Sequence, residues 1–351
     1  MKHPDSNANR HRYRGFSLVE IMIALLITGV LLTGISQIFI GTKRSYRIQD
    51  SVARMHANGR YALQTVMTDL RRAGYFGGLP GTHQITDNTA GGIRNLRSVA
   101  SDDGSCNSIN WVRMLTHPVF GTDDHRLGYD CLPHEPVHTG DILVTRYAAP
   151  WIIGGNHTAA DHMTKHPDHL YLRTSLTNGR LFAGKNEAAN PVNGNTRTAE
   201  LVAHAYFIRN RYATVATDCP GNRQIPTLYR MSQVNGKLVA QEVARGIEQF
   251  QVQYGIDTDN DNRVDRYVDA IAATDPRWQQ LVAVRVWLLA RAECPETQYD
   301  NTHQYLMGNT SVRPASTDQD GDGRIDGDVD GDGNDDYRRR LYLNTVALRN
   351  H

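Results

Sequence analysis

A long apolar segment close to the start of the chain is the feature that most constrains the fold. It runs from Phe16 to about Gly41 and follows a leader with four basic residues against one acidic residue, Asp5. Roughly 25 such residues can cross a bilayer as a helix, at about 1.5 Å per residue. Because the basic residues flank its N-terminal side, we expect a cytoplasmic N-terminus and a body beyond the membrane.

One carboxylate, Glu20, lies inside this apolar segment. An acid placed in lipid is costly, so its presence needs a reason. A secretory signal peptide would have a shorter apolar region and a small-residue cleavage site after it, which this segment lacks. A plain signal anchor fits the length of the segment but leaves Glu20 unexplained.

The order of residues around Glu20 favours a third interpretation. A basic leader, Gly15-Phe16, the acid and a long apolar helix follow one another, and this order resembles the processing site of type IV prepilins and pseudopilins. The resemblance implies cleavage between Gly15 and Phe16 by a prepilin peptidase, and N-methylation of Phe16. We also hypothesise that, in a filament, the new amine on Phe16 lies near Glu20 of a neighbouring subunit, because pairing would offset the cost of burying both charges.

The helix is expected to continue past the membrane. Residues 43–73 lack proline, and their apolar residues recur at spacings of three, four, seven and eight. These apolar residues are Val52, Met55, Leu63, Val66, Met67 and Leu70. Asn58-Gly59 is a weak point that favours a bend. The pattern predicts a cleaved leader at 1–15, a helix at 16–75 that spans the membrane over 16–41 and is amphipathic beyond it, and a head domain at 76–351.

The sequence of the head domain predicts mostly β-structure, because several segments alternate with period two and contain β-branched and aromatic residues. The candidate strands are residues 141–148, 169–174, 201–209, 227–232, 247–255, 281–291 and 339–348. A short helix is expected near 270–280, and long loops over 81–110 and 154–200. The expected fold class is α+β and pilin-like: a long N-terminal helix packed on a mostly antiparallel β head.

Three further stretches, residues 58–77, 246–292 and 342–350, resemble PilW-type minor pilins of the type IV pilus. The resemblance implies a minor pilin that helps to prime pilus assembly in a tip complex and supports adhesion and motility. It implies as partners the other minor pilins, the major pilin, the prepilin peptidase and the inner-membrane assembly platform. The chain would be a single-pass inner-membrane protein with a periplasmic head, incorporated into the pilus near its tip.

Two acidic loops match each other. Residues 257–269 and 318–330 both follow D-x-D-x-D-[NG]-R-[VI]-D-x-x-V-D, with seven of the thirteen positions identical. Alternate carboxylates in a tight loop can point at one hard cation, and calcium takes six to eight oxygen ligands. We therefore expect calcium as the cofactor, as one to three ions, with a solvated acidic loop as the alternative.

The expected ligands are carboxylates and one backbone carbonyl in each loop. In the first loop they are Asp257, Asp259, Asp261, the carbonyl of Arg263, Asp265 and Asp269. In the second loop they are Asp318, Asp320, Asp322, the carbonyl of Arg324 and Asp326, with Asp328, Asp330 and Asp332 as an overlapping set. Asn262 and Gly323 stand where a sharp turn needs a permissive backbone. Val264 and Ile325 are expected to pin each loop to the core.

The loops depart from the EF-hand in one respect. That motif has a bidentate Glu at its twelfth position, where this chain has Val268 and Val329. The flanking residues also predict strands rather than two helices. The loops therefore resemble the calcium loops of extracellular β-domains more than a helix–loop–helix sensor.

The cysteines and histidines give weaker signals. The four cysteines, Cys106, Cys131, Cys219 and Cys294, contain no C-x-x-C pair, so two disulfides are the simplest expectation outside the cytoplasm. Pairing Cys106 with Cys131 and Cys219 with Cys294 is the local choice among three connectivities, and four free thiols are the alternative. His162 and His166 are four residues apart, as zinc ligands on a helix can be, but Pro167 follows at once and we expect surface histidines.

The sequence predicts neither catalysis nor nucleic-acid binding. It contains no G-x-S-x-G and no phosphate loop, so we expect no enzyme. The net charge of +1 gives no reason to expect nucleic acid as a partner. The alternative function is a minor pseudopilin of a type II secretion system, which shares the N-terminal helix. A third class is a membrane-anchored calcium-binding module unrelated to filaments.

Overall fold

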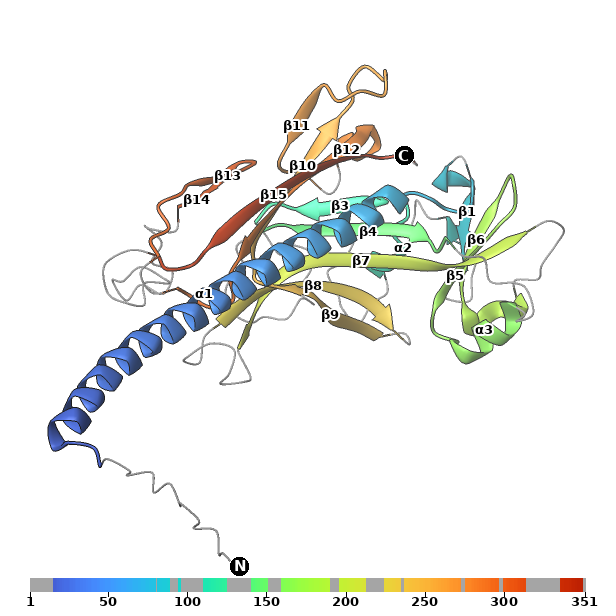
Figure 1. The fold of residues 1–351 in the computed structure, drawn as a ribbon. Helices are drawn as coiled ribbons and strands as arrows, with labels where there is room; N and C mark the ends of the chain where they lie inside the picture. Colours follow the sequence, from blue (N-terminus) through green and yellow to red (C-terminus); the bar gives the residue numbers. More distant parts are fainter. Residues whose placement is uncertain are drawn as a thin grey trace, which may run out of the picture. The chain divides into compact units, whose positions relative to one another are not determined.

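The computed structural model describes residues 15–79, 81–88, 94–95, 110–124, 140–150, 159–189, 196–212, 224–234, 237–272, 275–296, 299–313 and 335–349. The chain forms two compact units, Met1–Asp50 and Ser51–His351. The 55-residue helix α1 (Leu18–Arg72) begins in the first unit and ends in the second. Figure 1 shows α1 as one continuous helix. The strands all come after it in the sequence.

The first unit contains the apolar half of α1. Its most apolar 18-residue window has a mean hydropathy of 2.4 and is not buried by the rest of the protein, so this half is long and apolar enough to cross a membrane. The hydroxyls of Thr28, Thr33 and Thr42 donate to carbonyl oxygens four residues earlier, at 2.7, 2.9 and 2.8 Å. These three polar groups are therefore satisfied within the helix, as lipid requires.

The second half of α1 is amphipathic, as predicted. Within the second unit it buries Met55, Gly59, Ala62, Val66, Met67, Asp69 and Leu70. Val52 and Leu63 pack against the same core from its margin. All six apolar residues expected on this face therefore contact the head domain, and the helical spacing alone identified them.

Gly59 has a packing role in place of the expected bend. The helix runs through Asn58 and Gly59 without interruption. A Cβ on Gly59 would lie 2.4 Å from the ring of Tyr342, on the last strand of the head domain. The ring is held there by its hydroxyl, which lies 2.7 Å from Nδ1 of His56. The glycine therefore lets α1 and this strand approach closely.

The head domain contains a nine-stranded sheet, whose order is β2-β1-β6-β5-β7-β4-β3, with β8 paired to β7 and β9 paired to β8. Its strands are β1 (Ile85–Asp87), β2 (Arg94–Asn95), β3 (Val119–Thr122), β4 (Ile142–Ala148), β5 (Leu170–Thr174), β6 (Gly179–Ala183), β7 (Arg197–Tyr212), β8 (Gln224–Val234) and β9 (Lys237–Arg245). Among the described strands, β1 and β6 are the one parallel pair. The head is thus mostly antiparallel, as expected.

A four-stranded sheet of order β11-β10-β12-β15 and a hairpin of β13 and β14 complete the head domain (Figure 1). Their bounds are β10 (Ile247–Ile256), β11 (Arg266–Val268), β12 (Leu281–Arg291), β13 (Tyr305–Met307), β14 (Thr310–Val312) and β15 (Arg339–Ala347). The short helices are η1 (Thr82–Gln84), α2 (Asn110–Arg113), α3 (Ala159–Lys165), η3 (Gly184–Ala189) and η4 (Pro276–Gln280).

One hydrophobic core joins both sheets to α1. Phe250 of β10 and Leu288 of β12 belong to it together with Leu143 of β4, Leu228 of β8 and Leu70 of α1, all fully buried. The hairpin covers the other face of the four-stranded sheet, where Met307 packs with Trp287 and Leu289. The strands expected at 281–291 and 339–348 coincide with β12 and β15 almost residue for residue.

The strand expected at 169–174 is confirmed as β5, but the long loop expected over 154–200 is wrong, because this stretch also contains α3, β6, η3 and the start of β7. The expected loop over 81–110 likewise contains η1, β1 and β2. Most of these elements are short, and an Asn lies in the turn between two of them. For example, Ser175 and Asn178 close the β5–β6 turn through the bond from Ser175 N to Asn178 O, at 2.8 Å. Turn-forming residues in the sequence therefore led to the prediction of loops where short strands are present.

A buried carboxylate, Asp69, lies on the face of α1 that packs on the sheet. Its oxygens accept hydrogen bonds from Tyr147 Oη at 2.8 Å, His204 Nδ1 at 2.5 Å and Tyr206 Oη at 2.5 Å. Burial raises the pKa of Asp69, but the hydrogen bond and charge of His204, with the hydrogen bonds of Tyr206 and Tyr147, together hold the pKa below its usual value. The charge of Asp69 is therefore stabilised by donors from β4 and β7.

Replacing Asp69 by Ala is expected to lower the free energy of unfolding by about 3–5 kcal/mol, because two buried hydroxyls and a half-buried imidazole lose their acceptor. The measurement is thermal unfolding of the full chain in detergent, where the melting temperature should fall by roughly 6 °C or more. Asp168→Ala is the matched control. Asp168 forms an exposed ion pair with Lys185 at 3.3 Å, so this variant should change stability by at most about 1 kcal/mol. Equal melting temperatures for both variants would contradict the assigned role of Asp69.

Candidate functional site

The processing segment lies directly before α1. Residues 15–17 are not helical, and α1 begins at Leu18. Glu20 accepts a hydrogen bond from the backbone N–H of Ser17 at 3.3 Å. In a capping box, a Glu three residues after a Ser accepts a hydrogen bond from the backbone N–H of that Ser. The contact between Glu20 and Ser17 is this half of the motif. The leader, residues 1–14, lies outside the described residues, so cleavage after Gly15 stays a prediction.

The first acidic loop connects β10 to β11. Asp257 follows the last residue of β10 and is only 3% exposed. Its carboxylate accepts backbone hydrogen bonds from Asn260 and Asn262, both at 2.7 Å, and a longer one from Asp259 at 3.2 Å. Asp257 therefore organises the loop around its own side chain.

Two asparagines give the loop its sharp turns. Asn260 and Asn262 have φ angles of 64° and 63°, in the left-handed region that Asn tolerates better than most residues. The turn expected at Asn262 is therefore present. Val264 packs against β10, since its methyl groups lie 2.9 and 3.0 Å from where a Cβ on Gly255 would be. The loop is thus held to β10 at both of its ends, by Asp257 and by Val264.

Three of the expected ligands converge in this loop. One carboxylate oxygen each of Asp257, Asp259 and Asp265 lies within 4.8 Å of the others. Two oxygens on one calcium ion can lie this far apart, because each calcium–oxygen distance is about 2.3–2.6 Å. The carboxylates therefore fit one hard cation, and backbone carbonyls and water would have to complete its shell.

The electrostatics of the loop reflect this crowding. The backbone N–H of Asp261 lowers the pKa of Asp259, but the carboxylates around it outweigh that effect and raise the pKa above its usual value. Two hydrogen bonds from Thr258, at 2.5 and 2.7 Å, hold the pKa of Asp265 low. The loop thus contains a carboxylate whose ionised form a cation would favour.

The other expected ligands of the first loop are not in this group. Asp261 accepts a hydrogen bond from the N–H of Arg263 at 2.8 Å. Asp269, after β11, accepts a hydrogen bond from Gln253 Nε2 at 2.7 Å. The Arg263 carbonyl is a backbone group, outside this set of converging carboxylates. These three residues stay predictions as ligands, and Asp269 has a structural partner of its own.

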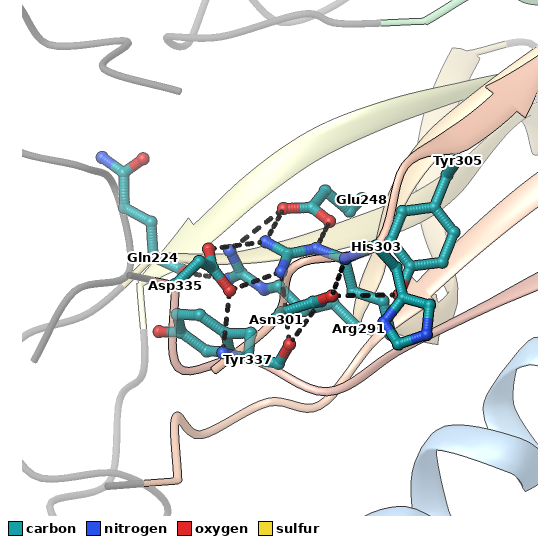
Figure 2. Close-up of polar contacts among 9 residues, drawn as sticks. Gln224, Glu248, Arg291, Asn301, His303, Tyr305, Asp335 and Tyr337 are labelled. Atoms are coloured by element: carbon teal, nitrogen blue, oxygen red, sulfur yellow. Dashed lines mark hydrogen bonds and ion pairs between the residues drawn. The ribbon is translucent and has the colours of Figure 1, made fainter. Parts of the chain in front are cut away.

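The second acidic loop lies outside the described residues, from Asp318 to Asp332. Its exit is described, because Asp335 and Asp336 are buried and mark where the chain rejoins the head. Figure 2 shows the polar contacts around this point, including Glu248, Arg291, Asn301 and Asp335. The acid-rich segment therefore ends in a fixed, buried network.

Arg339 is the main cation of this network. Its guanidinium bonds Glu248 of β10 at 2.5 and 2.9 Å and Asp335 at 2.5 and 3.0 Å, and Arg291 of β12 lies 3.4 Å from Glu248. Burial raises the pKa of Glu248, but Arg339 and Arg291 outweigh it and hold the pKa below its usual value. Asn301 adds a bond from Nδ2 to the carbonyl of Tyr337 at 2.8 Å. The end of the loop is thus joined to two strands.

Another group of acids was not expected from the sequence. Oxygens of Asp123, Asp124 and Asp141 also lie within 4.8 Å of one another, between the end of β3 and the start of β4. Asp141 accepts from the N–H groups of Asp124 at 3.1 Å and Val252 at 2.6 Å. Burial raises the pKa of Asp141 to about 8. The pairing of β3 with β4 brings these residues together, and no local sequence motif predicts this group.

Two further sequence features lie largely outside the described residues. Cys294 is disulfide-bonded, whereas Cys106, Cys131 and Cys219 fall in segments that are not described, so the connectivity stays a prediction. Residues 134–138 read H-E-P-V-H and match the zinc motif H-E-x-x-H by letter, a match that the sequence reasoning missed. That motif works on a helix, which Pro136 disfavours for Glu135. The absence of catalysis also stays a prediction.

Comparisons with known proteins find matches at both ends of the chain. Residues 205–350 match the family described as type IV pilus-assembly protein W, and residues 10–36 match the prokaryotic N-terminal methylation motif. No curated protein matches. Among solved structures, a type IV-like pilin from Thermus thermophilus is similar at 14% identity, over 62% of this chain and 80% of that chain. Its TM-score of 0.27 is too low to carry a structural argument.

The methylation motif, the apolar helix and the mostly antiparallel head define the chain as a type IV pilin-like protein. The matched stretch 205–350 contains every strand from β8 to β15 and both acidic loops. Together the two matches support a PilW-type minor pilin of the type IV pilus.

Replacing Arg339 by Ala is expected to lower the free energy of unfolding by about 3–5 kcal/mol, because Glu248 and Asp335 would keep buried charges without their main cation. Its neighbour Arg340 is exposed, and Arg340→Ala should change stability by no more than about 0.5 kcal/mol. Thermal unfolding of both full-length variants in detergent measures the difference. Similar melting temperatures for the two would show that the network contributes little.

Proposed function

We propose that this minor pilin helps to prime type IV pilus assembly as part of a tip complex with other minor pilins and the major pilin. Its apolar N-terminal helix suits an inner-membrane anchor, and we propose a periplasmic head that enters the pilus near its tip. The observation that carries the proposal is the combination of the methylation motif at residues 10–36 with the PilW match over residues 205–350. Adhesion and surface motility would follow from the assembled pilus.

The proposed partners in membrane and cytoplasm follow from the same role. A prepilin peptidase would cut between Gly15 and Phe16, and the inner-membrane assembly platform would receive the mature chain. The second candidate is a minor pseudopilin of a type II secretion system, because the methylation motif is shared by both classes. The match at residues 205–350 favours the pilus.

Deleting the gene separates these two candidates. Loss of surface pili with intact secretion of exoproteins would support the pilus role. Intact pili with impaired secretion would overturn it. Restoring the wild-type gene provides the control in each case.

Glu20 is expected to act after cleavage. Glu20→Ala should leave cleavage intact but reduce surface pili, because an amine on Phe16 would lose its partner in a neighbouring subunit. Glu20→Gln is the matched control, because it can still accept the hydrogen bond from Ser17 but carries no charge. The mature mass reports cleavage, and the sheared pilus fraction reports assembly. Normal piliation in both variants would contradict the charge-pairing hypothesis.

We also propose that the acidic loops bind calcium. The support is the convergence of Asp257, Asp259 and Asp265 and the backbone geometry around Asn260 and Asn262. Bound calcium would supply positive charge that holds the loop carboxylates together. An ion present at 100 times its dissociation constant stabilises the folded state by about 2.7 kcal/mol.

Calcium is expected to raise the melting temperature of the full chain in detergent relative to a chelator. Asp259→Asn should reduce the shift, and Asp259→Asn combined with Asp322→Ala should abolish it. Asp168→Asn, at an exposed site far from both loops in the sequence, should keep the wild-type shift. An unchanged shift in the double variant, or none in the wild type, would contradict calcium binding by these loops.

A further inference from the structure

A group of positive charges on α1 directly follows its apolar segment. The helix stays apolar as far as Ile40, whose side chain is 66% exposed. Lys43, Arg44 and Arg47 come next, and all three are exposed. Because α1 continues without a break to Arg72, these cations lie on the surface of a helix and not in a loop.

The three cations share one side of the helix. Arg47 is four residues after Lys43 and three after Arg44, and residues at these spacings are neighbours on a helix surface. Like charges at these spacings destabilise a helix. The first acid after Glu20 is Asp50, so the sequence sets one negative charge against three positive charges here. A partner with more negative charge would remove the remaining repulsion.

The distance along the helix places these cations at the surface of a bilayer. From Leu18 to Ile40 the helix rises about 33 Å, close to the roughly 30 Å of the hydrocarbon core. Lys43 lies about 4.5 Å beyond Ile40 along the helix, and Arg47 about 10 Å beyond it. The head-group layer on each side of the core is about 5–8 Å thick. Because basic side chains are long and flexible, all three can reach this layer.

An aromatic residue lies among the cations. Tyr46 stands between Arg44 and Arg47 in the sequence, and its side chain is 71% exposed. Tyrosine is enriched where a membrane meets water, because its ring is apolar and its hydroxyl forms hydrogen bonds. Tyrosine and basic residues just beyond an apolar segment are the residues that anchor a helix at this boundary.

The proposed orientation of the chain gives these cations a further interest. Basic residues usually lie on the cytoplasmic side of a membrane helix and set its orientation, and the leader has four of them. The proposed cleavage after Gly15 would remove these four residues and leave Lys43, Arg44 and Arg47 on the opposite side. The three cations therefore need a role other than setting the orientation.

We propose that Lys43, Arg44 and Arg47, together with Tyr46, bind the phosphate groups of anionic phospholipids at the membrane surface beyond the apolar segment. Charge complementarity identifies this partner, because phosphate oxygens accept strong hydrogen bonds from guanidinium and ammonium groups. The attraction opposes withdrawal of the helix from the bilayer. The inference rests on the proposed membrane anchor, but it needs neither the pilus role nor calcium binding.

The test measures lipid binding by the full chain in an uncharged detergent, with native mass spectrometry to count the bound lipids. Phosphatidylglycerol is the anionic probe, and phosphatidylcholine, which has no net charge, is the reference. Each basic residue near an anionic surface contributes roughly a fivefold factor in affinity. Phosphatidylglycerol should therefore bind at least about tenfold more tightly than phosphatidylcholine, and roughly tenfold more salt should weaken this preference by screening.

Replacing Lys43, Arg44 and Arg47 together by Gln should remove the preference for phosphatidylglycerol. Gln favours helices about as well as Lys and Arg, so α1 should form and the melting temperature should not change. The matched control replaces three exposed basic residues further along the same helix by Gln, namely Arg54, Arg60 and Arg71. They begin about 21 Å beyond Ile40 along the helix, past the head-group layer, so this variant should keep the preference.

Two results would overturn the proposal. The first is equal binding of both lipids by the wild type, or an equal loss of preference in both triple variants. The second is a Lys43, Arg44 and Arg47 variant that keeps the lipid preference but lowers the sheared pilus fraction. That result would assign the three cations to contacts with neighbouring subunits. Loss of the lipid preference with normal piliation would support lipid binding and count only against the pilus role.

Discussion

Asp69 places a full negative charge on the otherwise apolar face by which α1 packs on the head domain. Its donors, Tyr147, His204 and Tyr206, project from one face of two adjacent strands, β4 and β7. Apolar packing alone tolerates small rotations and shifts of a helix, because the hydrophobic effect has no direction. A carboxylate that must contact three donors does not tolerate such movements. Asp69 therefore fixes both the rotation and the axial position of this half of α1 on the sheet.

A second buried network has a similar role at the other end of the chain. Arg339 joins Glu248 on β10 to Asp335, at the exit of the second acidic segment. The acidic segment holds nine aspartates between residues 318 and 336, and such a density repels itself. Because its exit is fixed by a buried ion pair to a central strand, this repulsion does not pull β15 from the sheet. The two networks thus hold α1 and the last strand of the head domain on one core.

The sequence predicts the features that depend on local periodicity. The apolar face of α1 and the strands β10, β12 and β15 follow from spacing, and the turn at Asn262 follows from the acidic repeat. The sequence does not reveal groups assembled by strand pairing, such as Asp123 with Asp141 or His204 with Asp69, which are 135 residues apart. The short elements α3, β6 and β13 were also missed, because Gly, Asn and Pro nearby indicated loops.

The bond between Glu20 and the N–H of Ser17 bears on the cleavage that we propose between Gly15 and Phe16. Because Glu20 caps the helix at Ser17, α1 starts two residues after the Gly15–Phe16 bond, and that bond stays in non-helical chain. Peptidases cut backbone that is not engaged in a helix. The same carboxylate can therefore serve first as a stop that keeps the scissile bond accessible, and later as the acceptor for the amine that cutting creates. One side chain would then act first in cleavage and afterwards in subunit pairing.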